Sequence, residues 1–209
     1  MFDSIEIIFW DFDGVIMDSM KVRDEGFKIV LKDYPSDQVE KLMEFHRNNG
    51  GLSRYVKFRY FFEVIRNENI SEENVNILAN KFSEVMLERL MNRNLLIEDS
   101  FNFILNNYKN FDFHIVSGSD GKELNLICKE IDIDEYFLTI NGSPTPKTEL
   151  VRKLIQKYKY NTSRIMLIGD SHNDYEAALS NNIAFMGYNN PKLKVLPIKY
   201  LNNFFPNQK

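Results

Sequence analysis

Four short apolar runs, each followed by a small group of polar residues, constrain the fold of this 209-residue chain more than any other feature. Runs of this kind, rich in β-branched and aromatic residues, are typical of buried strands that end in turns. Helical periodicity separates them, which predicts an α/β fold with a parallel sheet and helices on both faces. The runs cover residues 5–10, 111–116, 164–168 and 183–188, and the helical patterns cover residues 122–131, 147–158 and 174–181.

One long segment interrupts this alternation. From about Met17 to Asn94 the sequence contains no strand-like run, and helical periodicity dominates, as in Val75–Leu90. Ser71, followed by two glutamates, is typical of a helix N-cap with acidic first-turn residues. We therefore predict a helical insert after the first strand.

Composition limits the classes of function. Hydrophobic residues make up 44% and charged residues 27% of the chain, as in ordinary globular proteins. With a net charge of −4 and no block of Lys and Arg, the chain is not expected to bind nucleic acid. No apolar run approaches the length of a membrane-spanning helix, and the N-terminus has no basic n-region or long apolar stretch, so we expect no membrane partner and a cytoplasmic protein. The sequence carries no signal for the oligomeric state, and a monomer is our working expectation. The single cysteine, Cys128, lies in an apolar helical pattern, which favours a core residue over a nucleophile.

Polar residues gather where the predicted strands end. Asp11 and Asp13 follow the first strand, Ser117 the second and Asp170 the third. In an open α/β sheet, ligands bind beyond the carboxyl ends of the strands. We therefore expect these side chains, distant in sequence, to be neighbours in space.

The pair Asp11 and Asp13 has the composition needed for phosphate chemistry. Two adjacent carboxylates repel each other and raise one pKa, a conflict that a hard divalent cation such as Mg²⁺ removes. One carboxylate can attack phosphorus to give an aspartyl-phosphate, and the other can protonate the leaving oxygen and later activate water. Asp and Gly also favour turns, so the pattern D-x-D-G alone fits an ordinary turn equally well.

Two further positions could hold a phosphate. Ser117 and Gly118 offer a hydroxyl and backbone N–H groups before a helix, although an ordinary N-cap region would have the same composition. Lys147 opens a predicted helix, where a cation is unfavourable. That placement makes sense if the ammonium serves an anion and the two carboxylates; otherwise Lys147 is a solvated surface residue.

The end of the third strand adds two acids. Asp170 is well placed as a further metal ligand. Asp174 could bind the metal through water, hold Lys147 in place, or cap the following helix, and these roles are compatible. We interpret His172 as an exposed loop residue or a support for the ligands, and His114 as a core or turn residue.

Together these motifs resemble the four signature motifs of the haloacid dehalogenase superfamily, in the same order and over the whole chain. The resemblance implies a Rossmann-like core with an α-helical cap of the C1 type inserted after the first motif. The core would comprise residues 1–16 and 96–209, and the cap residues 17–95. Within the superfamily, the motifs resemble those of phosphoglycolate-phosphatase-like and β-phosphoglucomutase-like members. The four motifs are Asp11–Ser19, Ile115–Ser119, Lys147 and Ile168–Asp174.

The resemblance also implies an activity. Asp11 would be the nucleophile and a metal ligand, and Asp13 the general acid/base with its backbone carbonyl on the metal. The dehalogenases lack an acid two residues after the nucleophile, so Asp13 favours a Mg²⁺-dependent phosphatase acting on a small phosphorylated metabolite, a sugar phosphate or a phosphoglycolate-like ester. A phosphomutase on the same scaffold is the first alternative. A catalytically silent binding module is the alternative from another class.

The remaining motif residues receive supporting roles from the same resemblance. Ser117, Gly118 and Lys147 would hold the transferring phosphoryl group, whose equatorial oxygens need neutralising and in-line positioning. Asp170 would be the third protein ligand of Mg²⁺, with Asp174 supporting it.

In this family the cap selects the substrate, which draws attention to residues 45–59. Gly50 and Gly51 give a flexible loop, and Arg54 and Lys57 follow on one helical face. Our hypothesis is that this loop faces the core site and that both cations contact a second anionic or polyol group of the substrate. The alternative is a solvated basic face beside a helix–helix turn.

Overall fold

A six-stranded sheet forms the centre of the molecule, and all its neighbouring strands are parallel. The structure, a computed structural model, describes residues 2–205. The strands lie in the order β3-β2-β1-β4-β5-β6. They are β1 (Ile7–Trp10), β2 (Asp112–Asp120), β3 (Thr139–Ser143), β4 (Ile165–Gly169), β5 (Ala184–Tyr188) and β6 (Lys199–Leu201).

The register of the central strands brings their carboxyl ends to the same level. Trp10, the last residue of β1, lies opposite Ile115 of β2 on one side and Ile168 of β4 on the other. Asp11 continues this alignment, because its N–H donates to the carbonyl of Ile168 over 2.9 Å. The residues that follow these strands therefore meet at one edge of the sheet.

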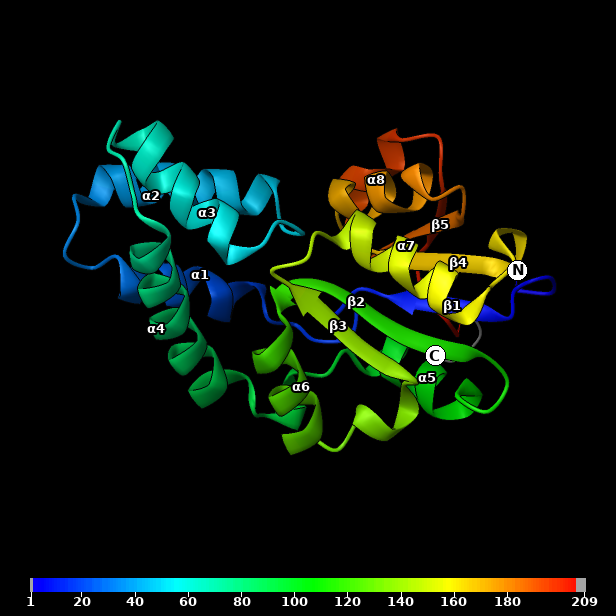
Figure 1. Cartoon of the computed structure of the whole chain (residues 1–209). Helices are drawn as coiled ribbons and strands as arrows, with labels where there is room; N and C mark the ends of the chain where they lie inside the picture. Colours follow the sequence, from blue (N-terminus) through cyan, green and yellow to red (C-terminus); the bar gives the residue numbers. More distant parts are fainter. Residues whose placement is uncertain (1, 206–209) are drawn as a thin grey trace.

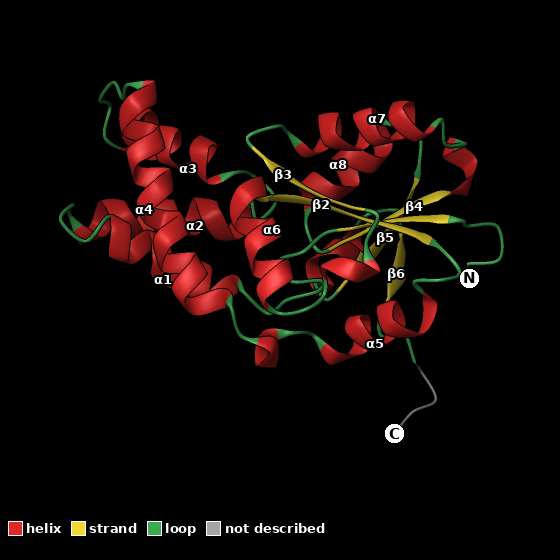
Figure 2. Cartoon of the chain, turned by 60° about the horizontal axis from the view of Figure 1, so that its bottom comes forward, coloured by secondary structure: helices red, strands yellow, loops and turns green. Residues whose placement is uncertain are grey.

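Helices cover both faces of the sheet (Figure 2). The side chains of β1 alternate between two apolar clusters: Ile8 and Trp10 pack with α5 and α6, whereas Ile7 and Phe9 pack with α7 and α8. These helices are α5 (Glu98–Asn107), α6 (Gly121–Glu130), α7 (Lys147–Tyr158) and α8 (His172–Ser180). Short 3₁₀ turns lie at Arg93–Leu95, Asp134–Tyr136, Thr162–Arg164 and Pro191–Val195.

The helices of residues 20–90, which lie between β1 and α5, form a group beside the sheet, at the left of Figure 1. Phe27, Phe58 and Phe82 pack against one another in this segment, and they belong to the same apolar cluster that covers one face of the sheet. The side chain of Ser71 accepts the N–H of Asn74, so it caps the last helix as expected. The helices are α1 (Met20–Val30), α2 (Ser36–Asn48), α3 (Arg54–Tyr60), a π-helical turn (Phe61–Ile65) and α4 (Glu72–Leu90).

The two connections between this segment and the sheet run side by side. Met17 forms an isolated antiparallel bridge with Leu96. The N–H of Asp18 donates to the carbonyl of Leu95 over 2.7 Å, and the N–H of Ile97 donates to that of Ile16 over 2.8 Å. A short two-stranded ribbon thus joins the helical segment to the core.

The predicted α/β architecture is confirmed, with differences at the edges. The edge strands β3 and β6 and the helix α5 were not anticipated. β3 is only half-buried over most of its length and contains Asn141 and Gly142, so it lacks the apolar run of a central strand. β2 continues past Val116 to Asp120 through an irregular register with β3, so Ser117 and Gly118 lie within the strand. Within residues 2–205, no helix combines the length and apolar composition needed to cross a bilayer.

Candidate active site

Asp11 and Lys147 form the centre of the group at the strand ends. Asp11 follows β1 directly and is buried, and Lys147 is buried at the first position of α7. The Nζ atom of Lys147 lies 2.8 Å from Oδ1 of Asp11 and also donates to Oδ1 of Asp174. Lys147 is therefore not a solvated surface lysine; its charge lies between two buried carboxylates.

Asp11, Asp170 and Asp174 form an acidic cluster, each offering an oxygen within 4.8 Å of the others. Burial raises the pKa of Asp11 from 3.8 to about 7, and the charge of Asp174 adds to the effect while Lys147 opposes it. Burial also raises the pKa of Asp170 well above its ordinary value, followed by the charge of Asp11. The single positive charge of Lys147 therefore does not fully offset the negative charges of Asp11, Asp170 and Asp174.

The donor set fits a hard divalent cation, which binds carboxylate oxygens. Asp174 is already engaged, because its Oδ2 accepts the N–H of Ser171 over 3.0 Å and the hydroxyl of Ser171 over 2.6 Å. These bonds form a capping box at the start of α8, in which Ser171 is the N-cap and Asp174 is the third helical residue. The helix therefore begins before Asp174, and the prediction that Asp174 itself is the N-cap is wrong, although its side chain does bind the N–H of the N-cap residue. Asp11 and Asp170 are the acids of the cluster best placed to face an ion.

Gly14 shapes the backbone beside these acids. Its φ of +77° lies in the left-handed region, and a Cβ there would overlap the carboxylate of Asp170. The turn after Asp13 therefore requires glycine for both conformation and space.

Asp13 points toward the helical segment rather than into the acidic cluster. Its Oδ1 accepts Nε of Arg23 over 2.5 Å and the hydroxyl of Ser19, and its Oδ2 accepts the hydroxyl of Ser119 over 2.5 Å. Burial alone would raise the pKa of Asp13, but Arg23 and the two hydroxyls outweigh it and lower that pKa. The two carboxylates of the D-x-D motif thus have different partners and opposite pKa shifts.

Ser117 and Gly118 lie where β2 passes under the helical segment. Ser117 is buried, and its Oγ accepts the N–H of Ser119 over 3.1 Å. A Cβ at Gly118 would overlap the carbonyl oxygen of Gly51, so the two backbones meet there. The N-cap of α6 is Asp120, which accepts the N–H groups of Lys122 and Glu123. The alternative that Ser117 merely caps this helix is therefore wrong.

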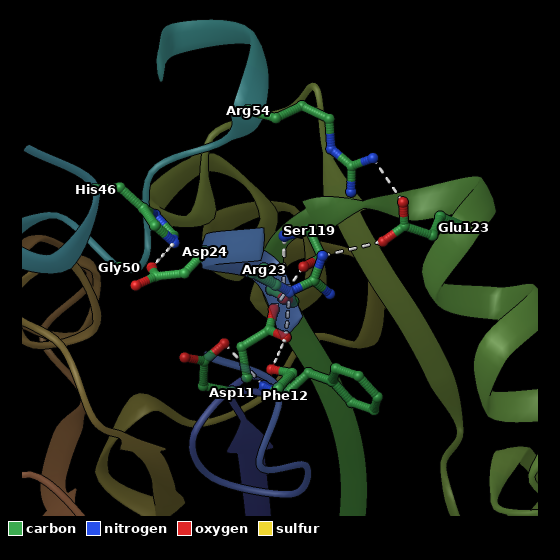
Figure 3. Close-up of polar contacts among 12 residues, drawn as sticks. Asp11, Phe12, Arg23, Asp24, His46, Gly50, Arg54, Ser119 and Glu123 are labelled. Carbon is green, nitrogen blue, oxygen red and sulfur yellow. Dashed lines mark hydrogen bonds and ion pairs between the residues drawn. The ribbon is translucent and has the colours of Figure 1, made fainter. Parts of the chain in front are cut away.

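Arg54 and Lys57 are buried, which excludes the alternative of a solvated basic face. Nη1 of Arg54 lies 2.5 Å from Oε2 of Glu123 (Figure 3). The same Nη1 lies 2.7 Å from the hydroxyl of Ser83, and Lys57 donates to the carbonyl of Gly50 over 3.1 Å. Burial lowers the pKa of Lys57 to about 7, and the positive charge of Arg23 adds to this shift.

A small cavity between the helical segment and the strand ends brings these cations close to Asp13 and Gly118. Arg23, Arg54 and Lys57 all line it, so the structure joins the residues singled out in the helical segment to those at the strand ends.

Sequence reasoning missed Arg23 and Glu123, which are both buried beside these residues. Glu123 lies in the first turn of α6, where acids are common for helix-dipole reasons, so its role left no signal. Arg23 lies on α1, and its position ten residues after Asp13 gave no pattern to read. Two of the three histidines had been interpreted from the sequence, and both are where they were expected: His114 is buried between Thr139 and Tyr160, and His172 is exposed at the start of α8.

Comparison with known proteins identifies the family. The model of the haloacid dehalogenase-like hydrolases matches residues 7–188. The chain belongs to this family. A phosphorylated carbohydrates phosphatase from Thermotoga maritima is 21% identical over 186 residues, 86% of this chain and 82% of the relative. These findings confirm the predicted family and support the predicted enzyme class.

Solved structures of haloacid dehalogenase-like proteins share the fold. A predicted phosphoglycolate phosphatase from Haemophilus somnus has a TM-score of 0.75 and 20% identity, over 98% of this chain and 96% of that one. The β-phosphoglucomutase of Clostridium difficile has a TM-score of 0.75 and 17% identity, over 95% and 91% of the two chains.

Proposed function

We propose that this protein is a Mg²⁺-dependent phosphatase that hydrolyses a small phosphomonoester through an aspartyl-phosphate on Asp11. A sugar phosphate or a phosphoglycolate-like ester is the expected class of substrate. The observation that carries the proposal is the buried group formed by Asp11, Lys147 and Asp170, whose acids have raised pKa values that a bound cation would relieve.

In this mechanism Asp11 attacks the phosphorus, and Lys147 holds both the nucleophile and a phosphoryl oxygen. Ser117 and the N–H of Gly118 bind further phosphoryl oxygens at the end of β2. A bound Mg²⁺, held by Asp11, Asp170 and the carbonyl of Asp13, would supply positive charge to the phosphoryl group.

Asp13 moves the proton in both halves of the reaction. It gives a proton to the leaving oxygen as the P–O bond breaks, and then takes one from the water that hydrolyses the aspartyl-phosphate. Arg23 favours the carboxylate form, whereas the negative phosphoryl group of a bound substrate favours the protonated form. Substrate binding therefore opposes the effect of Arg23 and raises the pKa of Asp13 toward the protonated form that the first half requires.

We propose that residues 17–95 act as the substrate-selecting cap over a core of residues 1–16 and 96–209. Arg54 and Lys57 would contact a second anionic or polyol group of the substrate. Their burial in the cavity beside Asp13 supports this role. The variant Arg54→Ala should lower kcat/KM for the good substrates; unchanged kcat/KM for every one of them would refute the assignment.

A phosphomutase is the second candidate, favoured by the three cations around the cavity, which could receive the second phosphate of a sugar bisphosphate. A mutase would convert a sugar monophosphate into its isomer in the presence of bisphosphate and release little free phosphate. A catalytically silent module would have no need for the buried group of charged residues formed by Asp11, Lys147 and Asp170.

The decisive experiment measures phosphate release from a broad panel of phosphorylated metabolites, with Mg²⁺ or with chelator. We expect turnover with Mg²⁺ alone, and loss of turnover in Asp11→Asn. Turnover at the wild-type rate in that variant would refute the mechanism. Absence of phosphate release from the whole panel, together with absence of isomerisation in the presence of bisphosphate, would favour the silent module.

We also propose that the enzyme acts as a monomer in the cytoplasm, on a metabolite rather than on nucleic acid. The single thiol, Cys128, is buried, and burial raises its pKa, so it is unreactive. Size-exclusion chromatography with light scattering would test the oligomeric state.

A further inference from the structure

Glu123 joins two helices of the proposed cap to the catalytic carboxylate Asp13. It comes from α6 of the core, is buried, and accepts Nη1 of Arg23 over 3.1 Å and Nη1 of Arg54 over 2.5 Å (Figure 3). We infer that Glu123 is a positioning residue that, through Arg23, fixes Asp13 in the orientation needed to protonate the leaving oxygen. This inference rests on the role proposed above for Asp13.

The four charged groups form a continuous chain of alternating sign. Nε of Arg23 contacts Asp13 and its Nη1 contacts Glu123, so two carboxylates fix the plane of one guanidinium. On the other side of Glu123, Arg54 is fixed by Glu123 and by the hydroxyl of Ser83. The orientation of Asp13 is therefore tied to helices α1 and α3 as well as to the core.

The orientation of the two arginines also leaves donors for a ligand. Nη2 of Arg23 and Nη2 of Arg54 are buried without a hydrogen-bond partner among the described residues, and both side chains line the cavity beside Asp13. A leaving group bound in this cavity would satisfy them. Rotation of Arg23 would misplace both Asp13 and a donor to the leaving group.

A purely structural role for Glu123 is a poor explanation of its burial. A buried ion pair often stabilises a fold no more than well-packed apolar residues would, because removing charges from water is costly. The cap and core also have a second polar contact: the hydroxyl of Tyr55 donates to Oδ2 of Asp120 over 2.8 Å. This contact spans the same interface without touching Arg23, which makes Tyr55→Phe a matched control.

The test compares Glu123→Gln with the wild type on two substrates of similar shape, phenyl phosphate and para-nitrophenyl phosphate, in Mg²⁺. Phenolate needs protonation to leave, whereas para-nitrophenolate leaves readily without it. The ratio kcat/KM covers the steps up to cleavage of the P–O bond. We expect Glu123→Gln to lower kcat/KM about tenfold or more for phenyl phosphate, and less than about threefold for para-nitrophenyl phosphate.

Three comparisons decide the outcome. Asp13→Asn should show the same dependence on the leaving group to a greater degree, and Tyr55→Phe should affect both substrates alike. In a double-mutant cycle, Glu123→Gln should add no leaving-group dependence to Arg23→Met, because both act through one chain of contacts. Thermal unfolding of each variant separates loss of fold from loss of positioning.

Equal losses on both substrates in Glu123→Gln, or multiplicative losses in the cycle, would overturn the inference. So would the same leaving-group dependence in Tyr55→Phe. None of these results affects the proposed function, which fails instead if Asp11→Asn retains wild-type turnover.

Discussion

The carboxylate of Asp11 should destabilise the metal-free protein at neutral and alkaline pH. Its pKa is about 7 in the folded protein against 3.8 as the ordinary value. Between these values the folded state binds the proton more tightly than the unfolded state, so the free energy of unfolding falls as pH rises through that window. At about 1.4 kcal/mol per unit, the loss reaches about 4 kcal/mol above pH 7.

Asp11→Asn replaces the carboxylate with a neutral group of the same shape. We expect the metal-free variant to be more stable than the wild type by about 2–4 kcal/mol near pH 8, with the difference shrinking toward pH 4. Urea denaturation in chelator at a series of pH values measures this. Added Mg²⁺ should raise the stability of the wild type much more than that of the variant. A variant less stable than the wild type near pH 8, or a difference independent of pH, would refute this account of the site.

Two further substitutions test the buried charges of the site and the close contact between Gly118 and Gly51. Lys147→Met removes the cation between Asp11 and Asp174. We expect a loss of about 3–5 kcal/mol in the free energy of unfolding at neutral pH in chelator, and a kcat reduced at least about a hundredfold. Near-normal values of both, in denaturation and steady-state assays, would contradict the assigned contacts. Gly118→Ala places a methyl group against the carbonyl of Gly51. We expect kcat/KM to fall about tenfold or more, while Mg²⁺ still raises the Tm of the variant. Unchanged kinetics would show that close contact between the two backbones is not needed for activity.

The positions at the strand ends could be predicted because parallel strands end at one edge of a sheet. Asp11 and Asp170 were singled out by this rule, whereas Lys147 was singled out because a cation is unfavourable at the start of a helix; α7 begins at Lys147 as predicted. In the structure, Trp10 pairs with Ile115 and Ile168, and this register places the residues that follow the three strands at one edge of the sheet.

The contacts of charged side chains in the helical segment could not be predicted. Arg54 and Lys57 have the spacing of a solvated helical face, and only the packing of α3 against the core shows that they are buried. The role of Glu123 could not be predicted for a related reason: an acid in the first turn of a helix is already accounted for by its favourable interaction with the helix dipole. The edge strand β3 was missed because its polar residues lack the apolar run that marked the central strands.

The paired connections at Met17 and Leu96 have a consequence for how the helical segment can be varied. Because Ile97 and Ile16 share a hydrogen bond, the chain leaves the core and returns to it within about one strand spacing, about 5 Å. A tight turn could close that gap and leave the register of the sheet unchanged. Insertion, removal or exchange of the helices between these two connections would therefore leave the alignment of Asp11 beside β2 and β4 unchanged.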